Sequence, residues 1–163
     1  MKPKINSTNF GSITIKSKTY EHDIIIRKDG LIEKRRKKLS KKIYGTSHKI
    51  SLAEAKYIYD KGAGELIIGT GQTGYVELSR KAEKFFEEKD CKIKLLPTTK
   101  AIKLWNRSKG KVIAMFHVTC WYLFWLSEFW RPKIYFESKK LKNSTRDKIW
   151  TNSIKENFGK TQI

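Results

Sequence analysis

The chain has 163 residues, 39% of them hydrophobic, and carries 36 Lys and Arg against 16 Asp and Glu, a formal net charge of +20. This length and apolar content fit one globular domain and exclude a wholly disordered chain. Two cysteines are too few for a disulfide framework, and the apolar run over residues 112–126 is shorter than the ~20 residues that cross a bilayer. Residues 1–12 contain no apolar signal segment, so we expect a cytoplasmic protein without a membrane span.

The positive charge is not confined to one end of the chain. Residues 1–120 contain 27 basic and 12 acidic side chains, a net charge of +15. Such an excess favours polyanion partners, because Lys and Arg that neutralise phosphates release condensed counterions. A lysine-rich composition without any binding role stays open as the alternative.

The N-terminal part predicts short antiparallel strands. Residues 12–15 alternate polar and apolar side chains, and residues 23–26 and 31–33 are rich in isoleucine and leucine. Between the last two strands, Asp29 and Gly30 form a dipeptide that suits a tight hairpin turn.

A basic segment then leads into a helix. Seven of the nine residues in 34–42 are Lys or Arg, and we expect them on a strand that leads into the polar loop 44–48. Ser51 and Glu54 have the S-x-x-E spacing of a capping box, which predicts a helix that ends near Gly62.

The second half alternates strands and helices. The predicted elements, in chain order, are a strand at 65–68, a glycine-rich loop at 69–74, a helix after Ser79, a strand at 92–96, a helix from Thr98 or Thr99 to Gly110, and a strand at 112–118. We therefore predict an α/β fold with helices packed on a central mixed sheet. Its N-terminal strands are antiparallel and its C-terminal half is a parallel βαβαβ unit.

Eight short strings occur in an order that resembles a known family. They are Phe10-Gly11, Tyr20 with residues 23–26, Asp29-Gly30, and residues 36–40, 44–48, 66–72, 96–98 and 117–120. In this order they resemble the archaeal branch of a family of small uncharacterised α/β proteins first seen structurally in a methanogen. Its wider relatives include the human adipogenesis-associated domain protein and mitochondrial complex I assembly factor three. The resemblance covers residues 5–120 and implies a layered α/β fold, but no established activity.

Residues 121–163 depart from that family, whose members usually end near the position of Cys120. We therefore expect a small α/β domain at 1–120 and an atypical extension at 121–163, first aromatic and then basic. Four of the five tryptophans lie in the extension, which suggests a hypothesis: a UGA stop codon decoded as Trp121 and read through. A disordered tail, or an evolved extension that docks on the sheet, remains open.

The glycine loop is the first candidate site. Residues 69–74 match G-x-G-x-x-G, but the following helix pattern starts only after Ser79, and no acidic residue ends the next strand, so a dinucleotide site is disfavoured. A strand-end turn and a small-anion site both stay open, and the resemblance implies a pocket nearby. The candidate pocket residues are Gly69, Thr70, Gly71, Gln72, Gly74, His48 and Asp23. Asp23 opens an apolar strand, so it must be paired or hydrogen-bonded if it is buried.

The basic segment is the second candidate site. A patch on its surface would bind polyanions, although a solvated basic loop is the alternative. The candidate patch residues are Lys34, Arg35, Arg36, Lys37, Lys38, Lys41 and Lys42.

The remaining residue types indicate neither a metal site nor a nucleophile. The three histidines and two cysteines lack metal-ligand spacing. His117 and Cys120 lie three apart on a predicted strand, so their side chains point to opposite faces, and we expect both to be buried structural residues. The other carboxylates, among them Glu54 and Glu83, are expected on helix surfaces.

We therefore predict an intracellular accessory or binding domain, similar to its assembly-factor relatives, with no assignable reaction and no cofactor. Its partner would be a protein or a small anion. Nucleic-acid binding is one alternative, and an enzyme acting on a small anionic substrate is the other.

Overall fold

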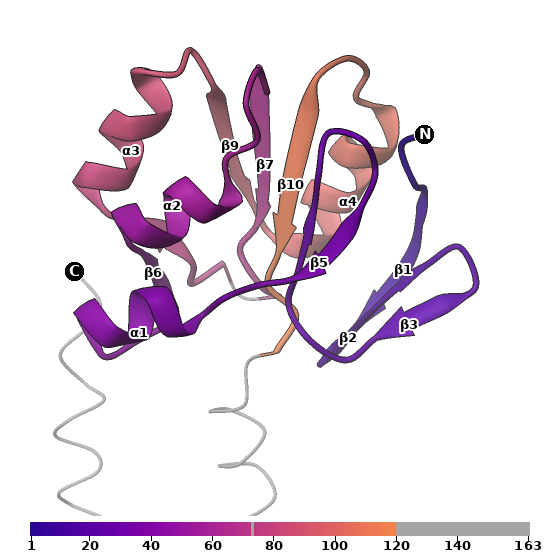
Figure 1. Cartoon of the computed structure of the whole chain (residues 1–163). Coiled ribbons are helices and arrows are strands. Elements are labelled where there is room, and N and C mark those ends of the chain that lie inside the picture. Colours follow the sequence, from indigo (N-terminus) through magenta and orange to yellow (C-terminus); the bar gives the residue numbers. More distant parts are fainter. Residues whose placement is uncertain (73, 120–163) are drawn as a thin grey trace, which may run out of the picture. The chain divides into compact units, whose positions relative to one another are not determined.

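The structure is a computed structural model that describes residues 1–72 and 74–119 (Figure 1). Predictions that fall on residues 120–163, including Cys120 and the aromatic and basic extension, lie outside the described residues. The strands are β1 (Ile5–Asn9), β2 (Ser12–Ile15), β3 (Lys18–Tyr20), β4 (Ile24–Ile26), β5 (Ile32–Lys34), β6 (Lys49–Ile50), β7 (Glu65–Gly69), β8 (Glu77–Leu78), β9 (Lys92–Leu96) and β10 (Val112–Phe116). The helices are α1 (Lys38–Tyr44), α2 (Leu52–Ile58), α3 (Arg80–Glu87) and α4 (Thr98–Arg107). None of these helices is long and apolar enough to cross a membrane.

A five-stranded mixed sheet is the centre of the fold. Its strand order is β5-β4-β10-β7-β9; β10, β7 and β9 run parallel, and β4 is antiparallel to both β10 and β5. All five residues of β10 are buried, which explains its unbroken apolar sequence, because a central strand is covered on both faces. The predicted α/β class is therefore confirmed, with its antiparallel N-terminal strands and its parallel C-terminal half.

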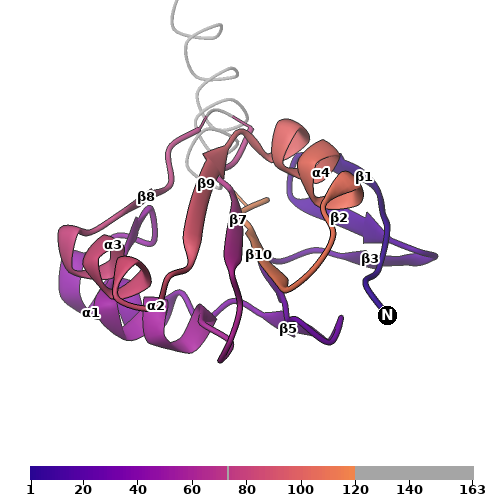
Figure 2. The ribbon, with the colours of Figure 1, turned by 90° about the horizontal axis from the view of Figure 1, so that it is seen from above.

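The two faces of the sheet are covered by different elements (Figure 2). On one face, α2 and α3 pack against the sheet around Ile25, Ile68 and Phe86. On the other face, α4 and the antiparallel β1-β2-β3 sheet enclose Ile5, Ile24, Trp105 and Phe116. Helix α3 follows β7 in the chain and helix α4 follows β9, so the chain leaves these two neighbouring strands toward opposite faces of the sheet. In open α/β sheets, ligands bind at the carboxyl ends of strands where this reversal occurs.

Several strand ends that are followed or preceded by polar residues meet at one edge of the sheet, here called the carboxyl edge. The parallel strands β7, β9 and β10 all end there. Because β4 is antiparallel to β10, it begins there, directly after Asp23, and β5 ends there, directly before Arg35. His117 follows the last residue of β10 and so lies at the same edge.

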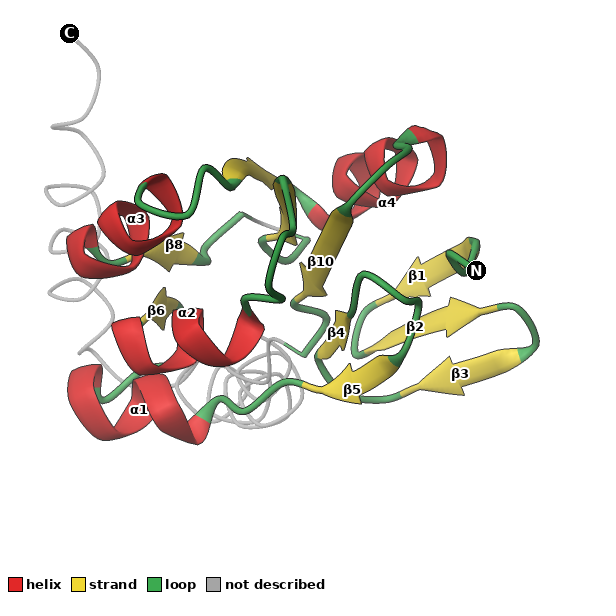
Figure 3. Cartoon of the chain, turned by 45° about the horizontal axis from the view of Figure 1, so that its top comes forward, coloured by secondary structure: helices red, strands yellow, loops and turns green. Residues whose placement is uncertain are grey.

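Several boundaries differ from the sequence prediction. The segment that follows β5 forms the short helix α1, which is capped by Gly45 with φ of 69°, whereas the sequence predicted a strand that leads into a loop at 44–48. Helix α2 ends at Ile58 rather than near Gly62, because Tyr59 is already extended. Strands β1 and β3 and the short parallel pair β6 and β8 were not predicted from the sequence (Figure 3). In β1 only Ile5 is buried, so the strand lacks an alternating pattern.

Candidate functional site

A buried carboxylate, that of Asp23, lies at the centre of the carboxyl edge. Its side chain is 1% exposed. One oxygen, Oδ1, accepts hydrogen bonds from the backbone N–H of Val118 at 3.0 Å, from the N–H of Thr119 at 3.1 Å and from Thr119 Oγ1 at 2.8 Å. Asp23 therefore fixes the chain that leaves β10.

The second oxygen of Asp23 faces three nitrogen donors. Oδ2 lies 2.6 Å from Nδ1 of His117, 3.0 Å from Nζ of Lys37 and 3.2 Å from Nη1 of Arg35. Burial alone raises the pKa of Asp23, but the hydrogen bond and charge of His117, with the charges of Lys37 and Arg35, outweigh it and hold this pKa well below its usual range. The carboxylate is thus ionised and fully hydrogen-bonded, as the sequence analysis required of a buried Asp23.

Arg35 joins this carboxylate to a second one, that of Glu54. Arg35 is 3% exposed; its Nε lies 2.6 Å from Oε1 of Glu54, and its Nη2 donates to the carbonyl of Ser47 at 2.6 Å. Glu54 is 0% exposed and also accepts a hydrogen bond from the hydroxyl of Ser40. Two predictions are therefore wrong: Arg35 does not belong to an exposed patch, and Glu54 does not lie on a helix surface. A buried guanidinium requires a buried anion in contact with it, and Arg35 and Glu54 are each other's partners in this sense.

His117 differs from its neighbours in having an unpaired polar atom. Its side chain is 2% exposed, which confirms the expected burial, although it follows β10 rather than lying within it. Nδ1 is engaged by Asp23, whereas Nε2 is buried and has no hydrogen-bond partner among the described residues. An ionised carboxylate at Nδ1 retains the proton there, so in neutral His117 the lone pair is at Nε2.

Two sequence-predicted residues border this nitrogen. A Cβ atom at Gly71, where φ is +100°, would lie 3.1 Å from Cδ2 and 4.0 Å from Nε2 of His117. The His48 ring lies edge-to-face with the His117 ring at 5.3 Å and also contacts the exposed ring of Tyr75, at 6.4 Å. Burial lowers the pKa of His48, and the charges of His117 when protonated, of Arg35 and of Lys37 lower it further, so this ring is neutral at pH 7.

The glycine loop is hydrogen-bonded to the start of α4. Gly71 donates its N–H to Oγ1 of Thr98 at 3.0 Å and accepts the N–H of Thr98 at 3.0 Å. A Cβ on Gly69 would lie 2.7 Å from the Phe116 ring, so this glycine permits close packing. Helix α3 begins only at Arg80, as the sequence analysis expected, and its N-terminus is separated from the glycines by β8. This geometry does not fit a dinucleotide fingerprint.

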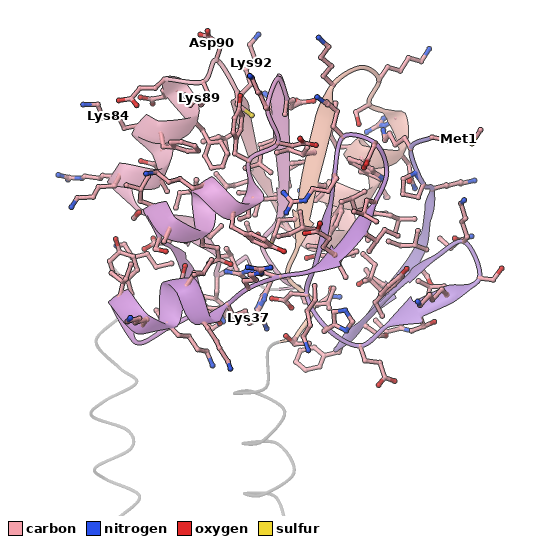
Figure 4. The ribbon with its side chains drawn as sticks, viewed as in Figure 1. Met1, Lys37, Lys84, Lys89, Asp90 and Lys92 are labelled. Carbon is pink, nitrogen blue, oxygen red and sulfur yellow. The ribbon has the colours of Figure 1, made fainter. Side chains whose placement is uncertain are left out.

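The basic segment divides into buried and exposed side chains. Arg35 is buried and Lys37 is half-buried, with its ammonium held by Asp23 and by Oγ1 of Thr119 at 2.5 Å. In Figure 4, Lys37 lies at the end of the molecule opposite to Lys89 and Lys92. The exposed members of the predicted patch are Lys34, Arg36, Lys38, Lys41 and Lys42.

The structure thus brings together three residues of the predicted pocket, Asp23, His48 and Gly71. Thr70 is buried and donates its N–H to the carbonyl of Leu96, whereas Gln72 and Gly74 are exposed. Sequence reasoning assigned His117 a structural role and missed Glu54. The signal for Glu54 was its position four residues before the core residue Ile58, on the same helix face. Within residues 1–72 and 74–119, no three His, Cys, Asp or Glu side chains are grouped as metal ligands would be.

These features define a class: a small α/β domain with a buried, charged cluster at the carboxyl edge of a mixed sheet. Residues 5–117 match the model of a family described as protein of unknown function (DUF498/DUF598). The chain belongs to this family, which confirms the resemblance to a family of uncharacterised proteins.

Solved structures agree with the assignment. The conserved hypothetical protein PH1505 from Pyrococcus horikoshii OT3 is 38% identical with a TM-score of 0.66, and the alignment covers 72% of this chain and 99% of that protein. A protein named MT938 is 32% identical with a TM-score of 0.61 at the same coverage. XCC1710 from Xanthomonas campestris shares the fold at 11% identity, with a TM-score of 0.58 over 72% of this chain and 86% of that one. No curated protein matches the chain.

The substitution Asp23→Asn tests the buried carboxylate. We expect a loss of about 3–5 kcal/mol in the free energy of unfolding at pH 7, because Arg35 and Lys37 lose a buried anion. Since the folded pKa of Asp23 lies below the ordinary value of 3.8, the ionised carboxylate contributes its full stability above that pH and loses it as the pH falls further. The difference between the two proteins should therefore be constant from pH 7 to about 5 and shrink below about 4.

Urea unfolding at a series of pH values measures this difference. Asp29→Asn is the matched control, because Asp29 is exposed in the β4–β5 turn, and it should change stability by less than about 0.5 kcal/mol. A difference for Asp23→Asn that stays the same down to pH 3 would contradict the assigned ionisation.

Proposed function

We propose that this chain is a non-catalytic binding domain of the cell interior, an accessory protein like the assembly-factor relatives that its sequence resembles. Its ligand binds at the carboxyl edge. The observation that carries the proposal is the buried Nε2 of His117, which has no partner among the described residues. Buried polar atoms in folded proteins are nearly always hydrogen-bonded, and an exception at a sheet edge suited to ligands favours a ligand contact.

The neighbouring hydroxyl groups favour binding over catalysis. An activated nucleophile needs a hydrogen bond to its base, here Nε2 of His117. Instead, the hydroxyl of Thr98 donates to the carbonyl of His117, and the hydroxyl of Thr119 donates to Asp23. Ser40 donates to Glu54, and Ser51 to the carbonyl of Leu39. Each of these hydroxyls is thus engaged in a structural role.

A thermal-shift screen with the full chain tests this proposal. The panel contains phosphate, sulfate, acetate and succinate. An anion at ten times its Kd should raise the Tm by about 5 °C in a domain of this size. His117→Gln, whose amide can still donate to Asp23 but lacks the second ring nitrogen, should lose the shift. His22→Gln should keep it, because the His22 ring packs on Tyr20. Equal shifts in all three proteins, or none in any of them, would contradict the proposal.

A second candidate function, nucleic-acid binding, is favoured by a separate observation. Five basic side chains of β5, α1 and their link are exposed, among them Lys38, Lys41 and Lys42 on α1. Exposed cations spaced along one segment can neutralise several phosphates. Arg35 and Lys37 contribute little to such contacts, because both are held by buried carboxylates.

Fluorescence anisotropy of a labelled RNA and a labelled DNA across a salt series tests this candidate. Replacing Lys38, Lys41 and Lys42 with Glu should weaken binding at least tenfold at low salt and flatten the dependence of log K on log salt. The control replaces Lys84, Lys89 and Lys92 with Glu, which makes the same change in net charge at the opposite end of the molecule (Figure 4). Equal losses in both variants would show that only the overall charge matters.

A further inference from the structure

We propose that the carboxyl edge binds a small oxyanion, such as a phosphate, sulfate or carboxylate group. This anion accepts a hydrogen bond from Nε2 of His117, and one proton is taken up when it binds. The inference rests on the proposed function, because it specifies the ligand of that same site. The ligand displaces the His48 ring, and the proton comes from solvent and resides on Nε2.

Asp23 determines which nitrogen of the His117 ring is available to a ligand. Its Oδ2 accepts the Nδ1–H of His117 at 2.6 Å, so any further proton that His117 takes up must occupy Nε2. Once that proton is on the ring, the Nε2–H is a hydrogen-bond donor. A donor that points away from Asp23 requires an acceptor, and an oxyanion supplies one.

Charge balance requires that an anion enter together with a proton. From the elements packed around His117, the charged groups are Asp23 before β4, Arg35 and Lys37 between β5 and α1, and Glu54 on α2. These two cations and two anions cancel, and His48 is a titratable ring in contact with His117. An added anion would be buried without compensation, which is costly. A proton on His117 restores neutrality.

His48 and Tyr75 provide the route from solvent to Nε2. The three rings form a series of increasing exposure: His117 is buried, His48 is half-buried, and Tyr75 is 60% exposed. The backbone beside His48 is fixed, because its carbonyl accepts the N–H of Glu77 in the β6–β8 pairing. Its side chain can therefore rotate away without moving the strand. A neutral His48 does not compete with His117 for the anion, since it offers no extra charge.

Isothermal titration calorimetry of the full chain with sulfate tests the inference. Sulfate keeps a constant charge between pH 6 and 8.5, so any proton taken up belongs to the protein. Titrations in two buffers with different ionisation enthalpies should give uptake approaching one proton at pH 8. The affinity should increase by up to about tenfold for each unit that the pH falls. His117→Gln should abolish both the uptake and the pH dependence, and His22→Gln should keep both.

A second variant keeps the test independent of how well His117→Gln folds. His48→Ala removes the covering ring and should bind sulfate several-fold more tightly, with the same proton uptake as the natural sequence. Sulfate binding that depends on His117 but takes up no proton would overturn this inference and leave the proposed function standing. Absence of sulfate binding overturns the inference as well. If the whole anion panel also fails to shift the Tm, the proposed function falls with it.

Discussion

The ionised carboxylate of Asp23 is the interaction on which the carboxyl edge depends. It accepts hydrogen bonds from three separate parts of the chain: the link between β5 and α1, the side chain of His117, and the backbone after β10. Each part brings donors that would otherwise be buried without acceptors. A neutral side chain of the same size could not balance Arg35 and Lys37, because buried cations need an anion in contact.

The pair formed by Arg35 and Glu54 extends this arrangement to the helical face of the sheet. Glu54 lies on α2, so the pair connects α2 to the end of β5, and Ser40 attaches α1 to the same carboxylate. The buried cluster is therefore neutral, whereas residues 1–120 together carry a net charge of +15. Protonation of His117 then changes the charge of the site.

The sequence was sufficient to predict the class of fold but not the composition of the site. The strands β7 and β10 could be predicted from their unbroken apolar runs, and the helices α3 and α4 from their apolar periodicity and the capping or turn residues at their ends. Arg35 and Glu54 could not be recognised in the same way, since a basic run and an S-x-x-E motif each have a common surface interpretation. Their burial depends on a contact between residues 19 positions apart, which no local pattern encodes.

Local sequence patterns also led to the inclusion of Asp23 and His48 in the candidate site and to a structural role for His117. A histidine at the end of an apolar strand is usually a core residue, and its burial agrees with that reading. Its exceptional property is the unpaired Nε2, which follows only from where Asp23, Gly71 and His48 lie in three dimensions. The signal for the proposed site is thus a ring nitrogen without a partner among the described residues, rather than a sequence motif.

The most direct test of the contact between Asp23 and His117 is to measure the protonation state of the His117 ring. The chain contains three histidines, so nitrogen–proton correlation spectra of the ¹⁵N-histidine-labelled protein can resolve each ring. We expect that Nδ1 of His117 carries the proton at pH 8 without sulfate, and that the ring gains a second proton, at Nε2, when sulfate is added. A ring whose single proton is on Nε2, with Nδ1 unprotonated, would contradict the assignment of Asp23 as the group that orients it.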